Sequence, residues 1–592
     1  MWHYAPPLQD FRFVLEELLD IQGEWSDMPA FAELGTETIV QILDAAGHFV
    51  VGTLAPVNAA GDAQGCHYRD GTVTTPPGFR QAYREYCDGG WPALACDVRH
   101  GGQGLPQLLN AVLYEMLYSA NHAWTMYPGI VHGGYECLRA HAAPDLIERY
   151  VPKIVSGEWL CTMCLTEPQA GSDVGLITTR AAPDGEGAYR ISGSKIFISG
   201  GEHDLTSNII HLVLARLPAA PAGTKGISLF LVPKYVGAQS SEPNAVSCDG
   251  IERKMGLKGS STCSLRFDGA QGWLVGEPHR GLAAMFVMMN SARLYVGLQG
   301  LGHAEMAYQN AVRYAHGRFQ MRVVGKAAAT SRPPGAADPI ALQPAIRKVL
   351  MTLRAFVEGE RAVGLWTAHL LDVAESHPDD GRRLAANDLL SLLTPIVKGF
   401  FTDNGFSLSS AALQVWGGYG YTRDCGIEQT LRDSRAAMIY EGTNEIQAVD
   451  LLVRKIIGDR GRRFASLVNL ADDMAQSCRE SPACRELGDA LTAVLVRWRE
   501  VTQAMIDEAA VDPAAAYRVA GDYLRLAGLC VLGAWWARMA RLAAARRDEP
   551  FYGAKWDTAR FYFDHLMPEA NLRLTLIDGR HAPLPPIAPP AA

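Results

Sequence analysis

The feature that most constrains the fold of this chain is an abrupt change in sequence texture near residue 158. From there to about residue 276, short apolar stretches rich in β-branched residues alternate with turns that contain Gly, Pro and Asp. The clearest stretches are residues 189–192, 195–198, 209–214 and 226–232. Short strands separated by such turns predict an antiparallel β-barrel or sandwich. The sequence therefore predicts a β-domain in the middle of the chain, flanked by regions with a different pattern.

On both sides of this region, apolar residues recur at the spacing of one helix face. The expected N-terminal helices cover residues 11–21, 36–51, 108–120 and 145–155, with a Gly- and Pro-rich interval at 52–79. The strongest C-terminal helices are expected at residues 285–316, 344–374, 387–416 and 443–457, with a loop at 331–339. A last helical block covers residues 467–478, 488–510 and 514–545, and the Pro/Ala-rich tail is expected to be disordered.

This layout predicts an α+β multidomain protein, because 592 residues exceed what one hydrophobic core can organise. We expect an N-terminal helical domain with an N-terminal extension, then a central β-barrel. A helical bundle and an additional C-terminal helical domain follow. The expected boundaries are residues 1–158, 159–280, 281–460 and 461–582, with the tail at 583–592.

Composition narrows the class of function. A net charge of -9 argues against a general nucleic-acid binder, which normally carries a basic excess. Residues 1–20 show no signal peptide, and no uninterrupted apolar run reaches the ~20 residues needed to cross a bilayer. The twelve cysteines are scattered, as reduced thiols in a cytoplasm are, so we expect a cytoplasmic protein.

Cys161 and Cys164 form a C-x-x-C pair, which can signal metal or redox chemistry. A structural zinc site needs four ligands, and no second pair stands at zinc-ligand spacing. The neighbouring residues are mostly apolar, as in a buried strand. We therefore favour packing over chemistry for this pair and expect no metal site.

Two motifs nearly three hundred residues apart carry the chemistry. The first, residues 165–173, contains Thr166-Glu167-Pro168 followed by Gly171-Ser172-Asp173, a tight turn with small side chains suited to a polar ring or a phosphate. The second, residues 440–447, places Glu441 beside Gly442 just before a helical run. Alone, the first could be a surface loop and the second a charge at a helix end.

Other segments between and after these motifs are equally ambiguous alone. Residues 414–420, which are rich in glycine, could be an ordinary helix C-terminus. Arg432, Asp433 and Arg435 would ordinarily form a solvated helix face. Only the joint occurrence of all these segments, in this order, changes the interpretation.

In that joint order the chain resembles the acyl-CoA dehydrogenase family over residues 160–457. Besides the two motifs, the family pattern contains residues 195–200, 254–257 and 414–420, with Arg293 in the first long helix and Arg318 at its end. Residues 4–14, 101–106, 127–129 and 201–204 further resemble the subgroup represented by 3-methylmercaptopropionyl-CoA dehydrogenases, which carries an extra C-terminal helical domain.

The resemblance implies an FAD-dependent α,β-dehydrogenation of an acyl-CoA thioester to the trans-2-enoyl-CoA. Glu441 would remove the Cα proton, while Cβ delivers hydride to the flavin. In some relatives the acid lies just before the helix arginine, but that position is Ala292 here. The resemblance leaves Glu441 as the sole candidate base, with Arg293 and Gly442 near the thioester and Ser172 near the substrate or CoA. A packing role for Arg293 is the alternative.

The resemblance also assigns cofactor residues. Those expected to line the isoalloxazine ring are Met163, Leu165, Thr166, Phe197 and Ser199. Those expected to bind the phosphates or adenine, several on a neighbouring subunit, are Arg318, Gln320, Gln414, Gly418 and Thr443. A homodimer is therefore expected. One departure is that the subgroup usually reads Arg-x-Gln-Gly-Arg where this chain has Met321 in place of the glycine; Tyr295, Trp416 and Tyr419 are also unusual.

Three functions stay open. The leading one passes electrons to an electron-transfer flavoprotein, with a fatty acyl-CoA or 3-methylthiopropanoyl-CoA as substrate. An acyl-CoA oxidase, in which oxygen takes the electrons, is the second. A DNA-associated flavoprotein on the same scaffold is the third, but after Arg460 basic and acidic residues are about matched, without the basic surface that DNA binding requires.

Overall fold

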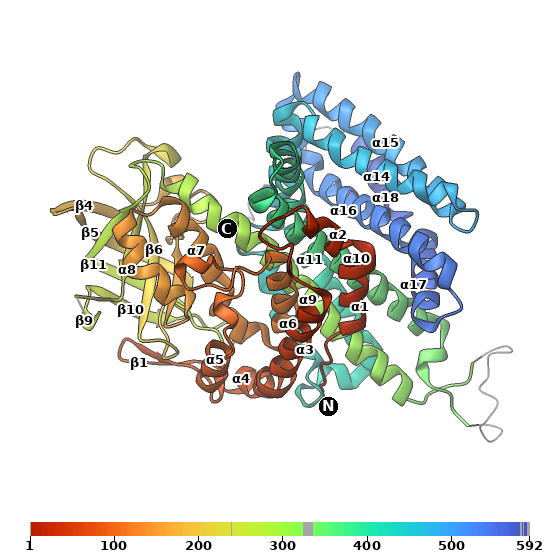
Figure 1. Cartoon of the computed structure of the whole chain (residues 1–592), viewed down its shortest axis with the longest axis horizontal. Helices are drawn as coiled ribbons and strands as arrows, with labels where there is room; N and C mark the ends of the chain where they lie inside the picture. The colour runs from red at the N-terminus through yellow and green to blue at the C-terminus, as the bar shows by residue number, and fades with distance from the viewer. Residues whose placement is uncertain (1, 238–239, 324–335, 580–582, 584, 589–592) are drawn as a thin grey trace. The chain divides into compact units, whose positions relative to one another are not determined.

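The structure is a computed structural model that describes residues 2–237, 240–323, 336–579, 583 and 585–588. The chain forms two compact units (Figure 1). The first unit comprises Met1–Leu8, Pro29–Arg313 and Gly405–Glu441, and the second comprises Gln9–Met28, Tyr314–Asn404 and Gly442–Ala592. The expected site residues are divided between the two units.

A seven-stranded sheet forms the β-region of the first unit. Its strands are β3 (Trp159–Cys164), β4 (Arg180–Gly185), β5 (Ala188–Ser199), β6 (Asn208–Arg216), β7 (Ile227–Pro233), β10 (Val246–Ile251) and β11 (Thr262–Val275). The order is β10-β11-β5-β4-β6-β3, and β7 pairs with both β11 and β6. The pairings of β11, β5, β4, β6 and β7 thus close into a ring, as the expected barrel requires.

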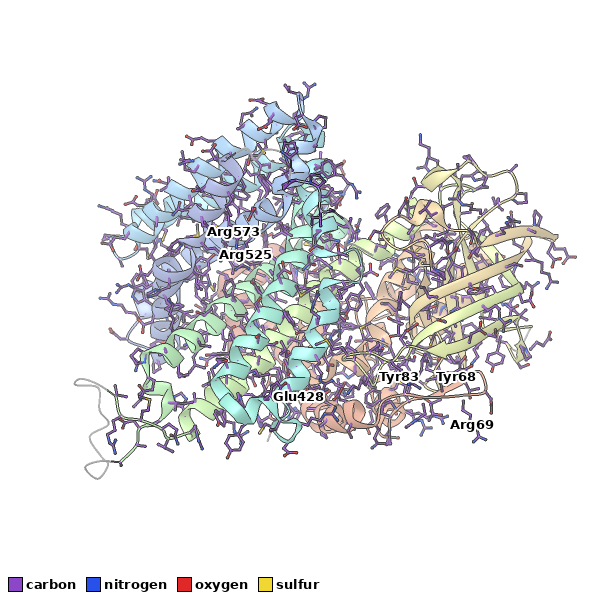
Figure 2. All side chains as sticks on the ribbon, turned by 180° about the vertical axis from the view of Figure 1, so that it is seen from behind. Tyr68, Arg69, Tyr83, Glu428, Arg525 and Arg573 are labelled. Carbon is purple, nitrogen blue, oxygen red and sulfur yellow. The ribbon has the colours of Figure 1, made fainter. Side chains whose placement is uncertain are left out.

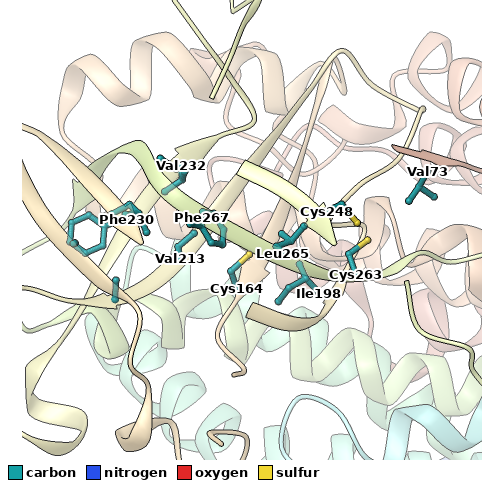
Figure 3. Close-up of a cluster of buried hydrophobic side chains, with 14 residues drawn as sticks. Val73, Cys164, Ile198, Val213, Phe230, Val232, Cys248, Cys263, Leu265 and Phe267 are labelled. Carbon is teal, nitrogen blue, oxygen red and sulfur yellow. The ribbon is translucent and has the colours of Figure 1, made fainter. Parts of the chain in front are cut away.

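The expectation of a purely antiparallel barrel is wrong, because β6 pairs in parallel with both β3 and β4. Strand β3 runs parallel to β6, from the pair Trp159–Asn208 to the pair Cys164–Val213. A parallel pair needs a long crossover, and the segment containing the Thr166 loop, β4 and β5 provides it. The barrel interior is a close-packed apolar cluster that includes Phe230, Phe267 and Cys164 (Figure 3).

The first unit also contains more helices than the sequence pattern indicated. Its N-terminal part comprises α3 (Thr36–Phe49), a π-helix (Val50–Leu54), α4 (Asn58–Gln64), the hairpin β1 (His67–Arg69) and β2 (Thr72–Thr74), α5 (Phe79–Asp88), α6 (Gln107–Thr125), α7 (Val131–His141) and α8 (Pro144–Val155). The Gly- and Pro-rich interval is therefore structured, and α5 and α7 were not expected. Helices α7 and α8 pack on β3.

Helix α5 was missed because its polar residues dilute a narrow apolar face. Phe79, Ala82, Tyr83 and Tyr86 are buried at helical spacing, and the hydroxyl of Tyr83 donates to the Gly157 carbonyl at 2.8 Å. Figure 2 labels Tyr83 together with Tyr68 of β1, which donates to the Cys248 carbonyl at 3.0 Å.

Two long helices contribute residues to both units, namely α9 (Gly281–Gly317) and α11 (Asp380–Trp416). The first unit ends with α12 (Ile427–Ser434) and the turn that leads to Glu441. It also contains a separate pair of short strands, β8 (Tyr235–Val236) and β9 (Glu242–Pro243). The expected long helices therefore exist. The loop expected at 331–339 falls largely outside the described residues, as does half of the tail that was expected to be disordered.

The second unit is a helical assembly. Its elements are α1 (Leu8–Arg12) with a π-helix (Phe13–Leu18), α2 (Ile21–Ser26), α10 (Pro344–Ser376), α13 (Asn444–Val449) with a π-helix (Asp450–Ile456), α14 (Arg462–Glu480), α15 (Arg485–Ala509), α16 (Pro513–Ala543), α17 (Pro550–Phe561) and α18 (Glu569–Asp578). Helix α16 packs against α10, α13, α14, α15, α17 and α18, all of them in this unit (Figure 1). The α16–α18 contact includes ion pairs: Arg525 bonds to Glu569, which also pairs with Arg573. Figure 2 labels the two arginines.

The N-terminal segment of the second unit packs with its C-terminal helices. Lys555 on α17 is fully buried, bonds to Asp10, and lies 2.8 Å from Glu358 of α10. Arg361 contacts the other oxygen of Asp10 at 2.5 Å. The Phe13 ring lies 5.5 Å from that of Phe551. Residues at opposite ends of the chain thus share one buried charged and aromatic cluster.

Among the residues that the structure describes, three helical segments are long and apolar enough, by length and composition alone, to cross a membrane: Thr36–Gln64, Gly281–Gly317 and Asp380–Tyr421. These segments were not expected from the sequence, because none contains an uninterrupted apolar run of ~20 residues. Their most apolar windows are 33%, 61% and 61% buried within the protein.

Candidate active site

The expected flavin-lining residues of the first unit lie on two neighbouring segments. Leu165 and Thr166 directly follow β3, and Phe197 and Ser199 lie at the end of β5. The backbone N–H of Ile196 donates to the Thr166 carbonyl at 2.9 Å. The structure thus brings together residues about thirty positions apart, as their expected common role requires.

A buried ion pair holds these two segments together. Lys195 Nζ donates to the Leu165 carbonyl at 3.0 Å and lies 2.8 Å from Glu167 Oε1, with both side chains almost completely buried. Glu167 also accepts from the backbone and hydroxyl groups of Thr178 and Thr179. Burial opposes its ionisation, but the charge of Lys195 and these hydrogen bonds outweigh that effect and lower the pKa of Glu167 to about 2.

Sequence reasoning named Glu167 only as part of a turn and did not identify its partner. The signal available was weak: a lysine inside an apolar strand, which is costly unless paired. Because each charge compensates the other, the pair can stay buried and hold the Thr166 loop against β5.

Phe197 is exposed because β5 contains a β-bulge. Lys195 pairs with Leu265 and Ile198 with Cys263, so two residues of β5 face one residue of β11. At the bulge, Phe197 has a φ of 59°, in the left-handed region, and is 58% exposed. Bulges re-aim side chains near active sites. An aromatic ring is thus presented to solvent beside the half-buried hydroxyls of Thr166 and Ser199.

Three further candidates of the first unit are exposed. Ser172 lies in the loop after β3, Gln414 near the end of α11, and Gly418 in the following 3₁₀ turn. A Cβ at Gly418 would meet nothing within 4 Å. These positions are accessible within the chain, as a contact to a ligand or a second subunit requires.

The second unit places Arg318 and Gln320 on a short extended segment. The Arg318 carbonyl accepts from Ile340, and the Gln320 N–H donates to the Asp338 carbonyl at 3.0 Å. Met321 follows with a φ of 62° and a side chain that is 73% exposed. This conformation suits glycine, which explains why the subgroup usually carries one here.

Glu441 lies in the left-handed region, with a φ of 57°, and Gly442 continues the turn with a φ of 83°. A non-glycine residue in this region is strained by about 1–2 kcal/mol. Tyr440, immediately before it, is anchored in the first unit: its hydroxyl donates to Gln299 Oε1 at 2.5 Å. The half-buried Glu441 therefore occupies a strained turn next to a fixed side chain.

In the second unit, Gly442 and Thr443 directly precede α13, with Thr443 at its N-cap. The fully buried Lys398 donates to the Gly442 carbonyl at 2.7 Å and to Asn444 Oδ1 at 2.8 Å. Thr443 Oγ1 accepts from the Ile446 N–H and thereby caps the helix. Sequence reasoning missed Lys398, whose only signal was a lysine at an apolar position of a helix.

Arg293 is buried in α9, and its guanidinium lies 6.0 Å from the centre of the Phe286 ring. The neighbouring Ala292 is also buried. Tyr295, one of the unusual residues, is buried and accepts a hydrogen bond of 2.5 Å from Asn110 on α6. These contacts fit the packing alternative for Arg293, and its substrate role stays a prediction.

The expectation of a solvated helix face at Arg432, Asp433 and Arg435 is wrong. Arg432 forms ion pairs with Asp62 and Glu428. Asp433 is buried and accepts from the Leu257 N–H at 2.6 Å. Burial raises the pKa of Asp433 to about 6. The segment anchors the loop at 254–257, whose Gly256 has no room for a Cβ because Asp433 Oδ1 would lie 2.5 Å from it.

Cys161 and Cys164 are both buried in β3. Residues three apart on a strand point to opposite faces, so the two thiols cannot chelate one ion there. Burial raises the pKa of Cys164 to about 12, which keeps its thiol protonated. Across the described ranges, no group of three or more His, Cys, Asp or Glu side chains could hold a metal ion.

The side chains at the candidate cofactor positions are chemically suited to bind FAD. The exposed Phe197 ring and the adjacent hydroxyls of Thr166 and Ser199 match a flat ring with one polar edge. The guanidinium and amides of Arg318, Gln320 and Gln414 match phosphates and adenine. The individual assignments remain predictions, since they rest on the chemistry of these groups.

Four family models match the chain. They are described as acyl-CoA dehydrogenase N-terminal domain (residues 36–158), middle domain (162–270) and C-terminal domain (319–456), and as acetyl-CoA dehydrogenase C-terminal like (470–584). The chain therefore belongs to the acyl-CoA dehydrogenase family, whose members are FAD-dependent oxidoreductases acting on CH–CH groups.

Particular relatives cover nearly the whole chain. It is 36% identical to the 3-methylmercaptopropionyl-CoA dehydrogenase of Ruegeria pomeroyi, over 96% of this chain and 97% of that protein. It is 33% identical to the broad-specificity linear acyl-CoA dehydrogenase FadE5 of Mycobacterium tuberculosis, over 96% of both. Caenorhabditis elegans ACDH-11, solved in complex with C11-CoA, shares the fold with a TM-score of 0.77 at 17% identity, covering 96% of this chain and 92% of that one.

Proposed function

We propose that this protein removes hydrogen from Cα and Cβ of an acyl-CoA thioester, with Glu441 as the base that takes the Cα proton. The observation that carries the assignment is the conformation of Glu441, whose φ of 57° lies in a strained region. Strain of this kind persists only where the surroundings impose it, and it concentrates at active sites.

A carboxylate suits the step because a thioester acidifies its Cα–H only moderately. When substrate excludes water, the carboxylate becomes more basic and approaches the acidity of that C–H bond. The enolate oxygen then requires hydrogen-bond donors, and the backbone N–H of Glu441 is the donor that the family resemblance assigns. Ala292, at the alternative position for the acid, has no ionisable group.

FAD, when bound, supplies the two-electron acceptor for the hydrogen that leaves Cβ. Met163, Leu165, Thr166, Phe197 and Ser199 would hold its ring, with the Lys195–Glu167 pair keeping the two segments together. Arg318, Gln320, Gln414, Gly418 and Thr443 would bind the phosphates and adenine. Several of these positions would serve the cofactor of a second subunit, so we also propose a homodimer.

The substrate class follows the relatives, whose names specify 3-methylmercaptopropionyl-CoA and linear acyl-CoAs. We propose that this chain takes a short or linear acyl-CoA, with 3-methylthiopropanoyl-CoA as one member of the test set. We further propose an electron-transfer flavoprotein as the acceptor of the electrons.

Anaerobic titration of the purified yellow protein with a panel of acyl-CoAs tests the proposal. At least one acyl-CoA should bleach the flavin absorbance in the wild type, and Glu441→Gln should abolish bleaching while retaining bound flavin. Failure of every acyl-CoA to reduce the wild type contradicts the enzymatic function. Bleaching that survives in Glu441→Gln contradicts the assignment of the base.

The same preparation separates the two electron acceptors. If the reduced protein stays reduced in air and is reoxidised by an electron-transfer flavoprotein, it is a dehydrogenase. Rapid reoxidation in air with formation of hydrogen peroxide would instead identify an acyl-CoA oxidase.

A further inference from the structure

Tyr440, the residue before Glu441, is held by the interior of the first unit. Its hydroxyl donates to Gln299 Oε1 of α9 at 2.5 Å and lies 3.3 Å from His122 Nε2 of α6. Its ring belongs to an apolar cluster with Ala123, Met126 and Leu257. The residue adjacent to the proposed base therefore makes polar and apolar contacts with two separate helices.

The polar contacts continue to a second histidine. His122 Nδ1 lies 2.7 Å from His303 Nε2, and His303 lies one helical turn from Gln299 on α9. Gln299, His122 and His303 are all at least 95% buried. Burial and the neighbouring His303 lower the pKa of His122, and burial lowers that of His303 to about 3, so both rings are neutral.

With the Gln299 amide oriented as in the structure, one proton arrangement satisfies these contacts. Tyr440 gives its hydrogen to Gln299 Oε1, which can only accept, so His122 Nε2 must donate to the tyrosine oxygen. A neutral His122 then has an accepting Nδ1, and His303 Nε2 must be the donor to it. In this arrangement every contact of the network joins one donor to one acceptor.

A break in α6 sets the position of His122. Asn121 has a non-helical backbone (φ -162°, ψ 85°), and its side-chain oxygen accepts from the Trp124 N–H at 3.0 Å. The last turn of the helix is therefore capped separately, with Met126 also in contact with Tyr440. His122 begins this re-oriented turn, which presents it to the tyrosine.

We propose that Tyr440, Gln299, His122 and His303 form a positioning network that fixes the strained Glu441 turn for removal of the Cα proton. The inference rests on the proposed function of Glu441. The network residues act through Tyr440 and need not touch substrate. Loss of the Tyr440 hydroxyl should let the turn sample other conformations, so the carboxylate is less often in place while substrate affinity is retained.

The test uses the full-length holoprotein and four variants. Tyr440→Phe removes only the hydroxyl, and His303→Leu removes the far end of the network without touching Tyr440. His303→Gln keeps an N–H donor for His122 and should therefore restore the rate of flavin reduction that His303→Leu loses. Tyr83→Phe is the matched control, since it removes another buried hydroxyl, which donates to the Gly157 carbonyl at 2.8 Å, in the same unit.

The first readout is the anaerobic rate of flavin reduction by the best acyl-CoA, with its dissociation constant. We expect Tyr440→Phe to lower the limiting rate about tenfold and His303→Leu about threefold, the effect of weakening one buried hydrogen bond. The dissociation constant should stay within about twofold of the wild type. Tyr83→Phe and His303→Gln should react nearly as the wild type does.

The second measurement follows proton transfer to Glu441 separately from hydride transfer to the flavin. Acetyl-CoA has no Cβ, so exchange of its Cα protons in D₂O, followed by NMR, measures proton transfer to Glu441 and back from solvent. The exchange rate should fall in the same variants and by similar factors.

Equal rates in Tyr440→Phe and Tyr83→Phe, or an effect confined to the dissociation constant, would overturn the network while leaving the proposed function intact. A wild-type protein that no acyl-CoA reduces and that exchanges no proton would overturn both.

Discussion

Lys195 and Glu167 form a buried ion pair in which Nζ and Oε1 lie 2.8 Å apart, and it joins the loop after β3 to the end of β5. Each charge would be unfavourable there without the other. The pair links the two segments that carry residues expected to line the flavin, so we expect it to set their spacing.

Glu167→Gln should lower the free energy of unfolding by about 3–5 kcal/mol, because it leaves a buried ammonium without its counter-charge. The folded pKa of Glu167, about 2, lies below its ordinary 4.5. The stabilisation is therefore present above pH 4.5 and is lost as the pH falls toward 2. The difference between wild type and variant in denaturant titrations should narrow over that window.

The control for this prediction is Glu158→Gln, whose partner Lys153 is at a similar distance, 2.9 Å, but whose pair is about half exposed. It should change stability by less than about 1 kcal/mol. Equal losses in both variants would show that the buried pair has no special role.

His211 should make the protein less stable in mild acid. Its side chain is buried on β6 and lies 2.7 Å from the Thr162 hydroxyl. Burial, with a smaller effect of Lys234, lowers its pKa to about 3 from 6.5. Between these values the unfolded state binds more protons, so stability falls as the pH falls, by up to about 1.4 kcal/mol per pH unit.

His211→Gln should reduce the pH slope of stability between pH 6 and 4 by the contribution of one histidine, because His203 and His303 are also buried with pKa values lowered to about 3; urea denaturation at several pH values measures this. His67, which is exposed on β1, offers the control variant His67→Gln, and the slope should be unchanged there. An unaltered slope in His211→Gln would mean that this ring is not held neutral.

Met321→Gly should stabilise the second unit, because the φ of 62° at this exposed residue strains any side chain with a Cβ. The matched variant is Met321→Ala, which loses the same side chain but keeps the Cβ. Glycine should exceed alanine by about 1 kcal/mol in the free energy of unfolding. An alanine variant as stable as the glycine variant would contradict the strained conformation.

Lys555→Met should release the N-terminal segment of the second unit. The substitution removes one of the two cations that neutralise Asp10 and leaves Glu358 with Arg354 at 2.6 Å. We expect a loss of about 3 kcal/mol and faster proteolysis within residues 9–28, followed by mass spectrometry. Arg546→Gln, at the half-exposed ion pair with Glu17, should cause little change.

The sequence pattern predicted the long elements well and the short or mixed ones poorly. Helices α9, α10, α11, α14, α15 and α16 were expected because a long periodic apolar pattern leaves few alternatives. Helix α5 and the hairpin β1–β2 were missed because their apolar residues are few. The parallel pairing of β3 with β6 could not be expected either, because strand direction depends on where the crossover places the chain.

In the candidate site, too, some residues could be predicted from the sequence and others could not. Thr166, Phe197 and Glu441 were selected from motifs, and the structure brings the first two together and gives the third a strained backbone. Lys195, Lys398 and the His122–His303 pair carried no motif. Their roles depend on partners distant in the chain, which no local pattern reveals.

The sequence by itself determined the class of protein, because motifs in a set order report a shared ancestry and chemistry, and it predicted Glu441 as the base. Only the tertiary structure decided how those residues are held. A buried charge or a neutral histidine is stable only when a particular partner lies within hydrogen-bond distance, and that distance is a property of the folded chain. The strain at Glu441 and Met321 is likewise visible only in backbone angles that the whole fold imposes.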